Sequence, residues 1–221
     1  MSRLRFAIAS LLLSTAVGCA AANAGAAAAP RKPVAVEPAK PAIDRAALRA
    51  KLAERRAITM SHFLAYRENR VYPLNNLPGG GMRHVWQDDA GNLCAAATLI
   101  SYDWGVDSTA NVGKENREVA LAKVTRGPLA DWILTSGLTH HEIVAIQVPG
   151  SDLFPVQRDP EIERLYGIYT DVERQLTGLR DESLDAATDA LMKRPELARE
   201  LLAGHVASAG KYTAKTNVAT R

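Results

Sequence analysis

The stretch "PLADWILTSGLTHHEIVAIQVPG", residues 128–150, decides the fold because it specifies two helices and the joint between them. Gly137 marks the end of the first helix, since glycine readily adopts the left-handed conformation that follows a helix C-terminus. Thr139 and Glu142 have the T-x-x-E spacing of a capping box and start the second helix. A hydrophobic staple is available from Leu138 and Ile143. The stretch therefore predicts a helical hairpin.

Apolar residues on the C-terminal side of the hairpin repeat with helical spacing. They predict a helix that is capped by Asp159, has Pro160 as its first residue and ends at Gly178. The pattern continues to Arg194, and Pro195 then opens a last helix. The side chains expected to face inward are Ile162, Leu165, Tyr169, Val172, Leu176, Leu184, Ala187, Leu191, Leu197, Leu201 and Leu202.

A long helix is predicted on the N-terminal side, from the cap Asp44 to about Arg70. Its apolar residues cover about half of the helix circumference, with Arg56 inside this face and Ile58 outside it. The stretch "YPLNNLPGGG", residues 72–81, must then be a loop because it contains two prolines and three glycines.

A short β-like run, His84–Gln87, precedes the turn "DAGN" at residues 89–92. The Ala-rich segment that begins at Cys94, "CAAATLISYDW", favours a helix over a long strand. Together the patterns predict a mainly α fold. It is a single helical domain over residues 44–210, with one short β-hairpin-like element near residues 84–94.

Both ends of the chain are predicted to lie outside this domain. Arg3 and Arg5 precede an uncharged run of twelve residues, which is too short to span a bilayer and has the pattern of an export signal over residues 1–19. Residues 20–43 are rich in alanine and proline and predict an extended tether. Residues 211–221 are polar and basic and predict a disordered tail.

The end of the export signal, "TAVGCA" at residues 15–20, resembles a bacterial lipobox. The resemblance implies that Cys19 is acylated and becomes the N-terminus of a lipoprotein, held to a membrane by its acyl chains. Because residue 20 is alanine and not aspartate, it also implies the outer membrane. The alternative is ordinary cleavage after Ala24, which would release a soluble periplasmic protein.

The distribution of charge excludes a nucleic-acid partner. Residues 44–210 carry 19 basic and 23 acidic side chains, a net charge of −4, so the domain has no basic footprint. The second helix of the predicted hairpin has only Gln147 to offer to bases and phosphates. The expected partners are the membrane, through the lipid anchor, and a protein of the cell envelope.

Cys94 is the candidate nucleophile of a possible enzyme. In the exported protein it has no cysteine partner for an intramolecular disulfide, and it lies at the start of a predicted helix, where the pKa of a thiol is lowered. A hydrolase or transferase would use Cys94 with His84 and Asp88. We favour a small buried residue instead, because a two-residue turn at residues 90–91 places His84 and Cys94 on opposite faces and free cysteine is most often buried.

The densest polar and aromatic cluster surrounds the turn. Asp89 is expected to cap the turn amides, which leaves Asp88 without a structural role. Asp88, His84 and Trp86, with Arg83 beside them, therefore form the candidate binding site, for a small ligand or a cation. No pair of histidines has the i, i+4 spacing of a helical zinc site, so we expect neither a metal centre nor a cofactor. His140 and His141 begin the second helix of the hairpin and are expected to face water.

Two segments resemble a group of exported bacterial proteins and lipoproteins of unknown function. The first contains D-x-x-G-x-x-C-A, here Asp88 to Ala95, and the second contains W-I-x-x-S-G-L-T-x-x-E, here Trp132 to Glu142. The resemblance implies a shared domain and an envelope location, and it implies no activity. We therefore expect a membrane-tethered envelope protein that acts by binding or in an assembly, and we favour this function over the enzyme based on Cys94.

Overall fold

The computed structural model describes residues 41–152 and 157–210 of the chain. Within them the protein is a mainly α-helical single domain of eight α-helices and one short 310-helix, as the sequence predicts, and it contains no extended strand. The elements are α1 (Arg45–Asn69), α2 (Ala95–Trp104), α3 (Val106–Glu115), η1 (Leu121–Lys123), α4 (Gly127–Thr135), α5 (His140–Ile146), α6 (Arg158–Gly178), α7 (Arg180–Met192) and α8 (Pro195–Leu202).

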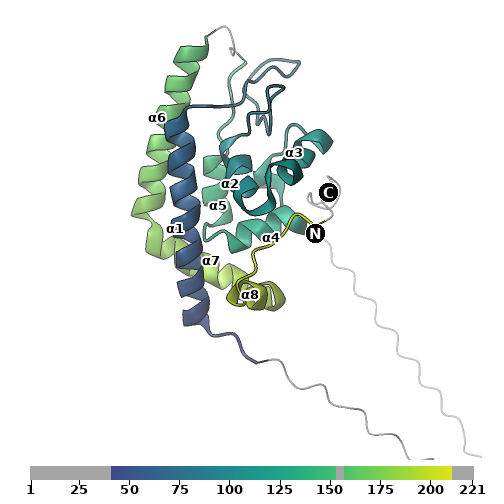
Figure 1. The fold of residues 1–221 in the computed structure, drawn as a ribbon. Helices are drawn as coiled ribbons and strands as arrows, with labels where there is room; N and C mark the ends of the chain where they lie inside the picture. Colours follow the sequence, from purple (N-terminus) through teal and green to yellow (C-terminus); the bar gives the residue numbers. More distant parts are fainter. Residues whose placement is uncertain (1–40, 153–156, 211–221) are drawn as a thin grey trace, which may run out of the picture. The chain divides into compact units, whose positions relative to one another are not determined.

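Helix α1 runs along the whole domain and packs beside α6, with α7 and α8 crossing near its N-terminal end (Figure 1). It begins where predicted, because the Asp44 carboxylate accepts hydrogen bonds from the amides of Ala46 and Ala47 at 2.8 and 3.2 Å. It ends at Arg70, which takes the left-handed conformation with φ of 53°. As expected, Ile58 lies on the exposed side of this helix.

The predicted hairpin is present as α4 and α5. Gly137 follows α4 with φ of +82°, and a Cβ at this position would lie 2.3 Å from the backbone nitrogen of Arg56. The glycine therefore both ends the helix and lets α1 approach. Thr139 and Glu142 form the complete capping box: each side chain accepts a hydrogen bond from the other residue's backbone amide, at 3.2 and 2.7 Å.

Two hydrophobic clusters are joined through α1. The larger cluster contains the C-terminal half of α1, with α2, α4, α5 and α6 around it. The smaller cluster packs the N-terminal half of α1 against α7 and α8. Residues from the whole length of α1 are thus buried, which makes this helix the common support of the domain.

A buried ion pair fixes α1 to the hairpin. The Arg56 guanidinium donates to both carboxylate oxygens of Glu142, at 2.7 and 3.0 Å, and also to the carbonyls of Gly137 and Leu176. Burial alone would raise the pKa of Glu142, but hydrogen bonds from Arg56 and from the Thr139 amide hold it below its ordinary value. One arginine on the inward face of α1 thereby connects α4, α5 and the end of α6.

Three details differ from the sequence prediction. Helix α6 begins at Arg158, so Pro160 is its third residue; this is tolerated because amides of the first turn have no partner within the helix. Leu202 is 37 % exposed, not inward-facing. Helix α3 and η1 were not predicted, because their residues show no clear apolar period.

The hairpin-like element near residues 84–94 is a turn with a single bridged pair, Gln87 and Leu93. The predicted register paired Gln87 with Cys94, so it was wrong by one residue. The argument that His84 and Cys94 face apart because of that register does not hold.

Several predictions fall on parts of the chain that the structure does not describe: the export signal with Cys19, the tether up to residue 40, and the tail over residues 211–221. No helix of the described ranges is long and apolar enough to cross a membrane.

Candidate functional site

Asp88 holds the turn that follows it. Its carboxylate accepts hydrogen bonds from the backbone amides of Leu74, Ala90 and Asn92 at 2.9, 3.0 and 2.8 Å, and from the Asn92 side-chain amide at 3.0 Å. The residue is only 6 % exposed. Because both oxygens are used, Asp88 fixes the shape of the turn and ties it to the loop before it.

The sequence prediction for Asp88 and Asp89 was therefore wrong, because each residue has the role that was expected of the other. Asp89 was expected to cap the turn, but it is exposed and pairs with Arg117 at 2.8 Å and with the Asn76 side chain. Asp88, which was left without a structural role, is the cap. The two differ because Asp88 points inward beneath the turn, where the amides converge, and burial requires each of them to find a partner.

Trp86 and His84 support the turn from the inside. Trp86 is fully buried and donates from Nε1 to the carbonyl of Thr109 at 2.9 Å. A Cβ at Gly113 would lie 2.8 Å from its ring, so the glycine lets α3 pack closely. His84 is half-buried and its Nδ1 has no hydrogen-bond partner among the described residues. Burial lowers the pKa of His84, although a hydrogen bond to the backbone of Gln147 opposes this effect.

Cys94 precedes α2 and is 4 % exposed. Burial raises the pKa of its thiol to about 11, and the nearby amides of Ala96 and Ala97 at the helix start only partly offset this. The burial that the sequence predicts is thus present. A nucleophilic thiolate needs a lowered pKa and access to substrate, and this position supplies neither.

The structure places Cys94, His84 and Asp88 around one turn, but no hydrogen bond joins them within the described residues. The Asp88 carboxylate is occupied by the turn amides, while the His84 and Cys94 side chains are both near Gln147. The Gln147 side chain itself bridges the backbone of Val119 and Leu121. The cluster serves as a scaffold, and its outer surface is where a ligand could bind.

That outer surface is a groove of about 450 Å³, which we name the turn groove. The end of α1, the turn after Asp88, α2 and the first residue of α3 form its walls. Its lining residues are Tyr66, Asn69, Val71, Gly91, Asn92, Leu93, Thr98, Ser101, Tyr102 and Val106. The volume lies within the range of about 300–1,000 Å³ that is usual for ligand sites.

Exposed apolar side chains gather in the turn groove. Val71 is 51 %, Tyr102 55 % and Val106 60 % exposed. Tyr102 stacks on His62 of α1, with ring centroids 3.5 Å apart and planes inclined by 11°. Burial lowers the pKa of His62, so the neutral imidazole is the form that supports Tyr102 at neutral pH.

The sequence interpretation did not identify these residues, although a signal was present. Thr98, Ser101 and Tyr102 have i, i+3, i+4 spacing in a helix whose other residues, apart from Asp103, are apolar, so they form one polar stripe. Gly105, with φ of +80°, then separates α2 from α3 and brings Val106 to the same groove.

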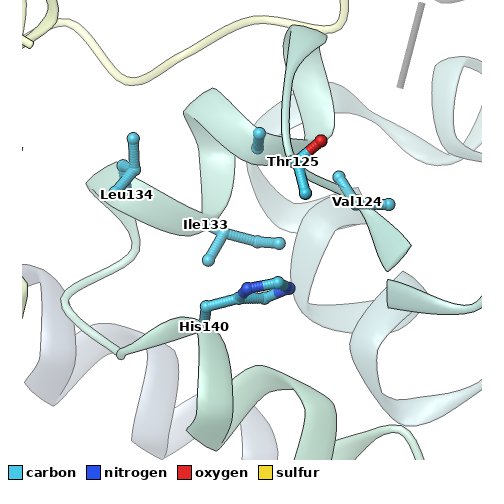
Figure 2. A pocket seen from close by; sticks show the side chains of 6 residues that line it. Val124, Thr125, Ile133, Leu134 and His140 are labelled. Atoms are coloured by element: carbon cyan, nitrogen blue, oxygen red, sulfur yellow. The ribbon is translucent and has the colours of Figure 1, made fainter. Parts of the chain in front are cut away.

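A second hollow, of about 270 Å³, lies beside the hairpin. Figure 2 shows the His140 ring beneath Ile133 of α4, with Val124 and Thr125 on the opposite wall. His140 is exposed, as expected, yet one ring nitrogen lies 2.8 Å from the Leu121 carbonyl, so the side chain is not freely solvated. Four of the six residues that line this hollow are apolar, namely Val124, Ala130, Ile133 and Leu134.

The described residues contain no group of three or more histidine, cysteine, aspartate or glutamate side chains that could hold a metal ion. Comparison with known proteins gives no further guide to the site: no family model, no curated protein and no solved structure matches the chain.

Proposed function

We propose that the protein is a lipid-anchored binding module of the bacterial cell envelope, and that its partner binds in the turn groove. One observation carries the proposal. Among the described residues, four large hydrophobic residues are more than half exposed, and three of them, Val71, Tyr102 and Val106, line this groove. Exposed apolar groups that converge on one concavity are typical of an interaction site.

The N-terminal segment of the sequence supports the proposed lipid anchor. The lipobox-like segment ends at Cys19, and 24 residues separate it from the cap of α1 at Asp44. The sequence therefore leaves a spacer between the proposed anchor and the domain.

The alternative function, a hydrolase or transferase that uses Cys94 with His84 and Asp88, has no comparable observation in its favour. Its nucleophile is buried and its acid is occupied by four hydrogen bonds from amides. A cation at the same turn would have to displace those amides from Asp88.

Site-specific crosslinking in intact cells tests the binding role. Val106 is replaced by the photo-crosslinker p-benzoylphenylalanine, and Leu179, which is 47 % exposed and lies outside the groove, is replaced in a matched control. We expect light-dependent adducts with envelope material from position 106 and few or none from position 179. Equal adduct formation at the two positions would contradict a specific site in the groove.

The anchor is tested separately. Cys19→Ser should abolish labelling by a fatty-acid probe and release the protein from the membrane pellet, because the acylated thiol is lost. Cys94→Ala is the matched control, and it should leave both measurements unchanged. A wild-type protein that is soluble and begins at Gly25 would show ordinary signal cleavage.

A further inference from the structure

We infer that the turn groove binds a neutral carbohydrate. The inference rests on the proposal that this groove is the binding surface, and it adds the chemical class of the ligand. Three features of the groove lead to it: the absence of charged side chains from its lining, a set of neutral hydrogen-bonding groups without partners, and an aromatic ring held in place from behind.

The lining of the groove is neutral. None of its ten residues is charged, although 23 % of the residues in the chain are. A site for an anionic or cationic ligand would need an opposite charge, because an ion that loses water without a partner is strongly disfavoured. An uncharged ligand has no such requirement and fits this lining.

The groove also offers neutral hydrogen-bonding groups that the protein does not use. The side chains of Asn69, Thr98 and Tyr102 have no hydrogen-bond partner within the described ranges 41–152 and 157–210. Asn92 donates its amide to Asp88, so its side-chain oxygen remains able to accept. Amides and hydroxyls can both donate and accept, as sugar hydroxyls do, and a few such groups can orient a ligand.

Tyr102 provides a prepared surface for a sugar ring. One face of its ring is stacked on His62, which restricts the side chain before any ligand arrives. The faces of aromatic rings carry negative partial charge, and the C–H groups on one face of a pyranose are positively polarised, so the two surfaces attract. Because the ring is already ordered, binding loses little side-chain entropy.

The turn that lines the groove is also held in place by hydrogen bonds. Asp88 fixes the turn, and the Tyr66 hydroxyl donates to the carbonyl of Leu93 at 3.4 Å. Gly91, with φ of +88°, has no side chain to obstruct the wall. The concavity of about 450 Å³ has the size of a ligand site. This volume suits a short stretch of glycan.

The test measures binding of neutral tetrasaccharides to the full chain, purified in detergent, by isothermal titration calorimetry. The probes are chitotetraose, cellotetraose and maltotetraose, which differ in the acetamido group and in linkage. We expect at least one probe to bind. Tyr102→Ala should weaken its binding by about tenfold or more, the equivalent of about 1.4 kcal/mol. Tyr102→Phe, which keeps the ring, should weaken it by less than about threefold, and Asn69→Ala should have an intermediate effect.

Met82→Ala is the matched control, because Met82 is as exposed as Tyr102 but lies outside the turn groove. Circular dichroism of each variant confirms that it is folded. If no tetrasaccharide binds at millimolar concentration, or if Tyr102→Ala and Met82→Ala have the same effect, the carbohydrate inference is overturned. If no saccharide binds but position 106 crosslinks to a protein, the groove is still a binding site, and its ligand is that protein. Failure of both experiments overturns the two proposals together.

Discussion

The hairpin α4–α5 and the turn after Asp88 are both short segments with a defined shape, but different kinds of contact hold them. The hairpin is shaped within itself, since the capping box joins residues 139 and 142 and Gly137 supplies the bend. The turn depends on groups further away, because Asp88 also receives the amide of Leu74. We expect a segment held by local contacts to keep its shape when its surroundings change. A segment held by distant contacts should lose its shape.

The largest loss of stability is expected at the buried ion pair that joins the hairpin to a distant residue, the pair of Glu142 with Arg56. Glu142→Gln should destabilise the protein by about 3–5 kcal/mol, because it leaves Arg56 buried without its counter-charge. Urea denaturation measures the loss. Asp171→Asn, which disrupts an exposed pair with Arg174, is the matched control and should cost less than about 0.5 kcal/mol.

The same ion pair predicts a dependence on pH. The pKa of Glu142 is lower in the folded protein than its ordinary value of 4.5, so its stabilising contribution is complete above about pH 4.5. The contribution is lost as the pH falls through the folded-state pKa. The difference in stability between the wild type and Glu142→Gln should therefore narrow in acid, and a constant difference between pH 7 and pH 3 would contradict the assignment.

A smaller effect is expected at the turn. Asp88→Ala should cost about 2–3 kcal/mol, because it leaves buried backbone amides without acceptors. Asp89→Ala, its exposed neighbour, should cost less than about 0.5 kcal/mol. Only Asp88→Ala should change the shape of the turn that lines the turn groove, so only this variant should bind saccharide more weakly. Equal costs for the two substitutions would mean that the carboxylates share the capping.

Cys94 should show a still smaller effect on stability. Cys94→Ala should cost about 1 kcal/mol and leave any cellular phenotype intact, while Cys94→Leu should cost about 1–3 kcal/mol through overpacking. The wild-type thiol, with its pKa of about 11, should react slowly with a maleimide at neutral pH and rapidly in denaturant. Rapid labelling of the folded protein, with loss of phenotype in a folded Cys94→Ala, would instead promote Cys94 to a catalytic role.

The smallest effects are expected from the two histidines of the hairpin. His141→Ala should change stability by less than about 0.5 kcal/mol, because the side chain is exposed and has no hydrogen-bond partner among the described residues. His140→Ala should cost up to about 1 kcal/mol, since it removes the contact with the Leu121 carbonyl. Thermal unfolding of the two variants side by side measures the difference, and the reverse order would place His141 in the core.

What could be predicted from the sequence follows the same division between local and distant contacts. The caps Asp44 and Thr139, the glycine bend and the inward position of Arg56 on α1 were predictable, because each depends on residues within a few positions along the chain. The roles of Asp88 and Asp89 were not, because both could cap the turn locally, and only the folded chain, in which the Leu74 amide also donates to Asp88, shows that Asp88 is the one that points inward. The turn groove was not predictable for the same reason: its walls come from three separate segments, and no local pattern states that they meet.

The position of Arg56 along α1 also has a mechanical consequence. A pull on the chain ahead of Asp44 enters the domain at the first turn of α1. The pairs of Arg45 with Asp189 and Arg49 with Asp185, both exposed on α7, would be loaded first and would open one after the other. Exposed ion pairs are individually weak, so most of the resistance in this part of the helix comes from Leu48 and Leu52, which are fully buried against α7 and α8.

The buried pair of Arg56 and Glu142 comes next along the same helix, and it anchors α1 to three other helices at once. Tension must break this clamp before it reaches Tyr66 and Asn69, the residues of α1 that line the turn groove. Under such a pull, the N-terminal part of α1 would separate from α7 and α8 while the Arg56–Glu142 pair still holds the end of the helix that lines the turn groove.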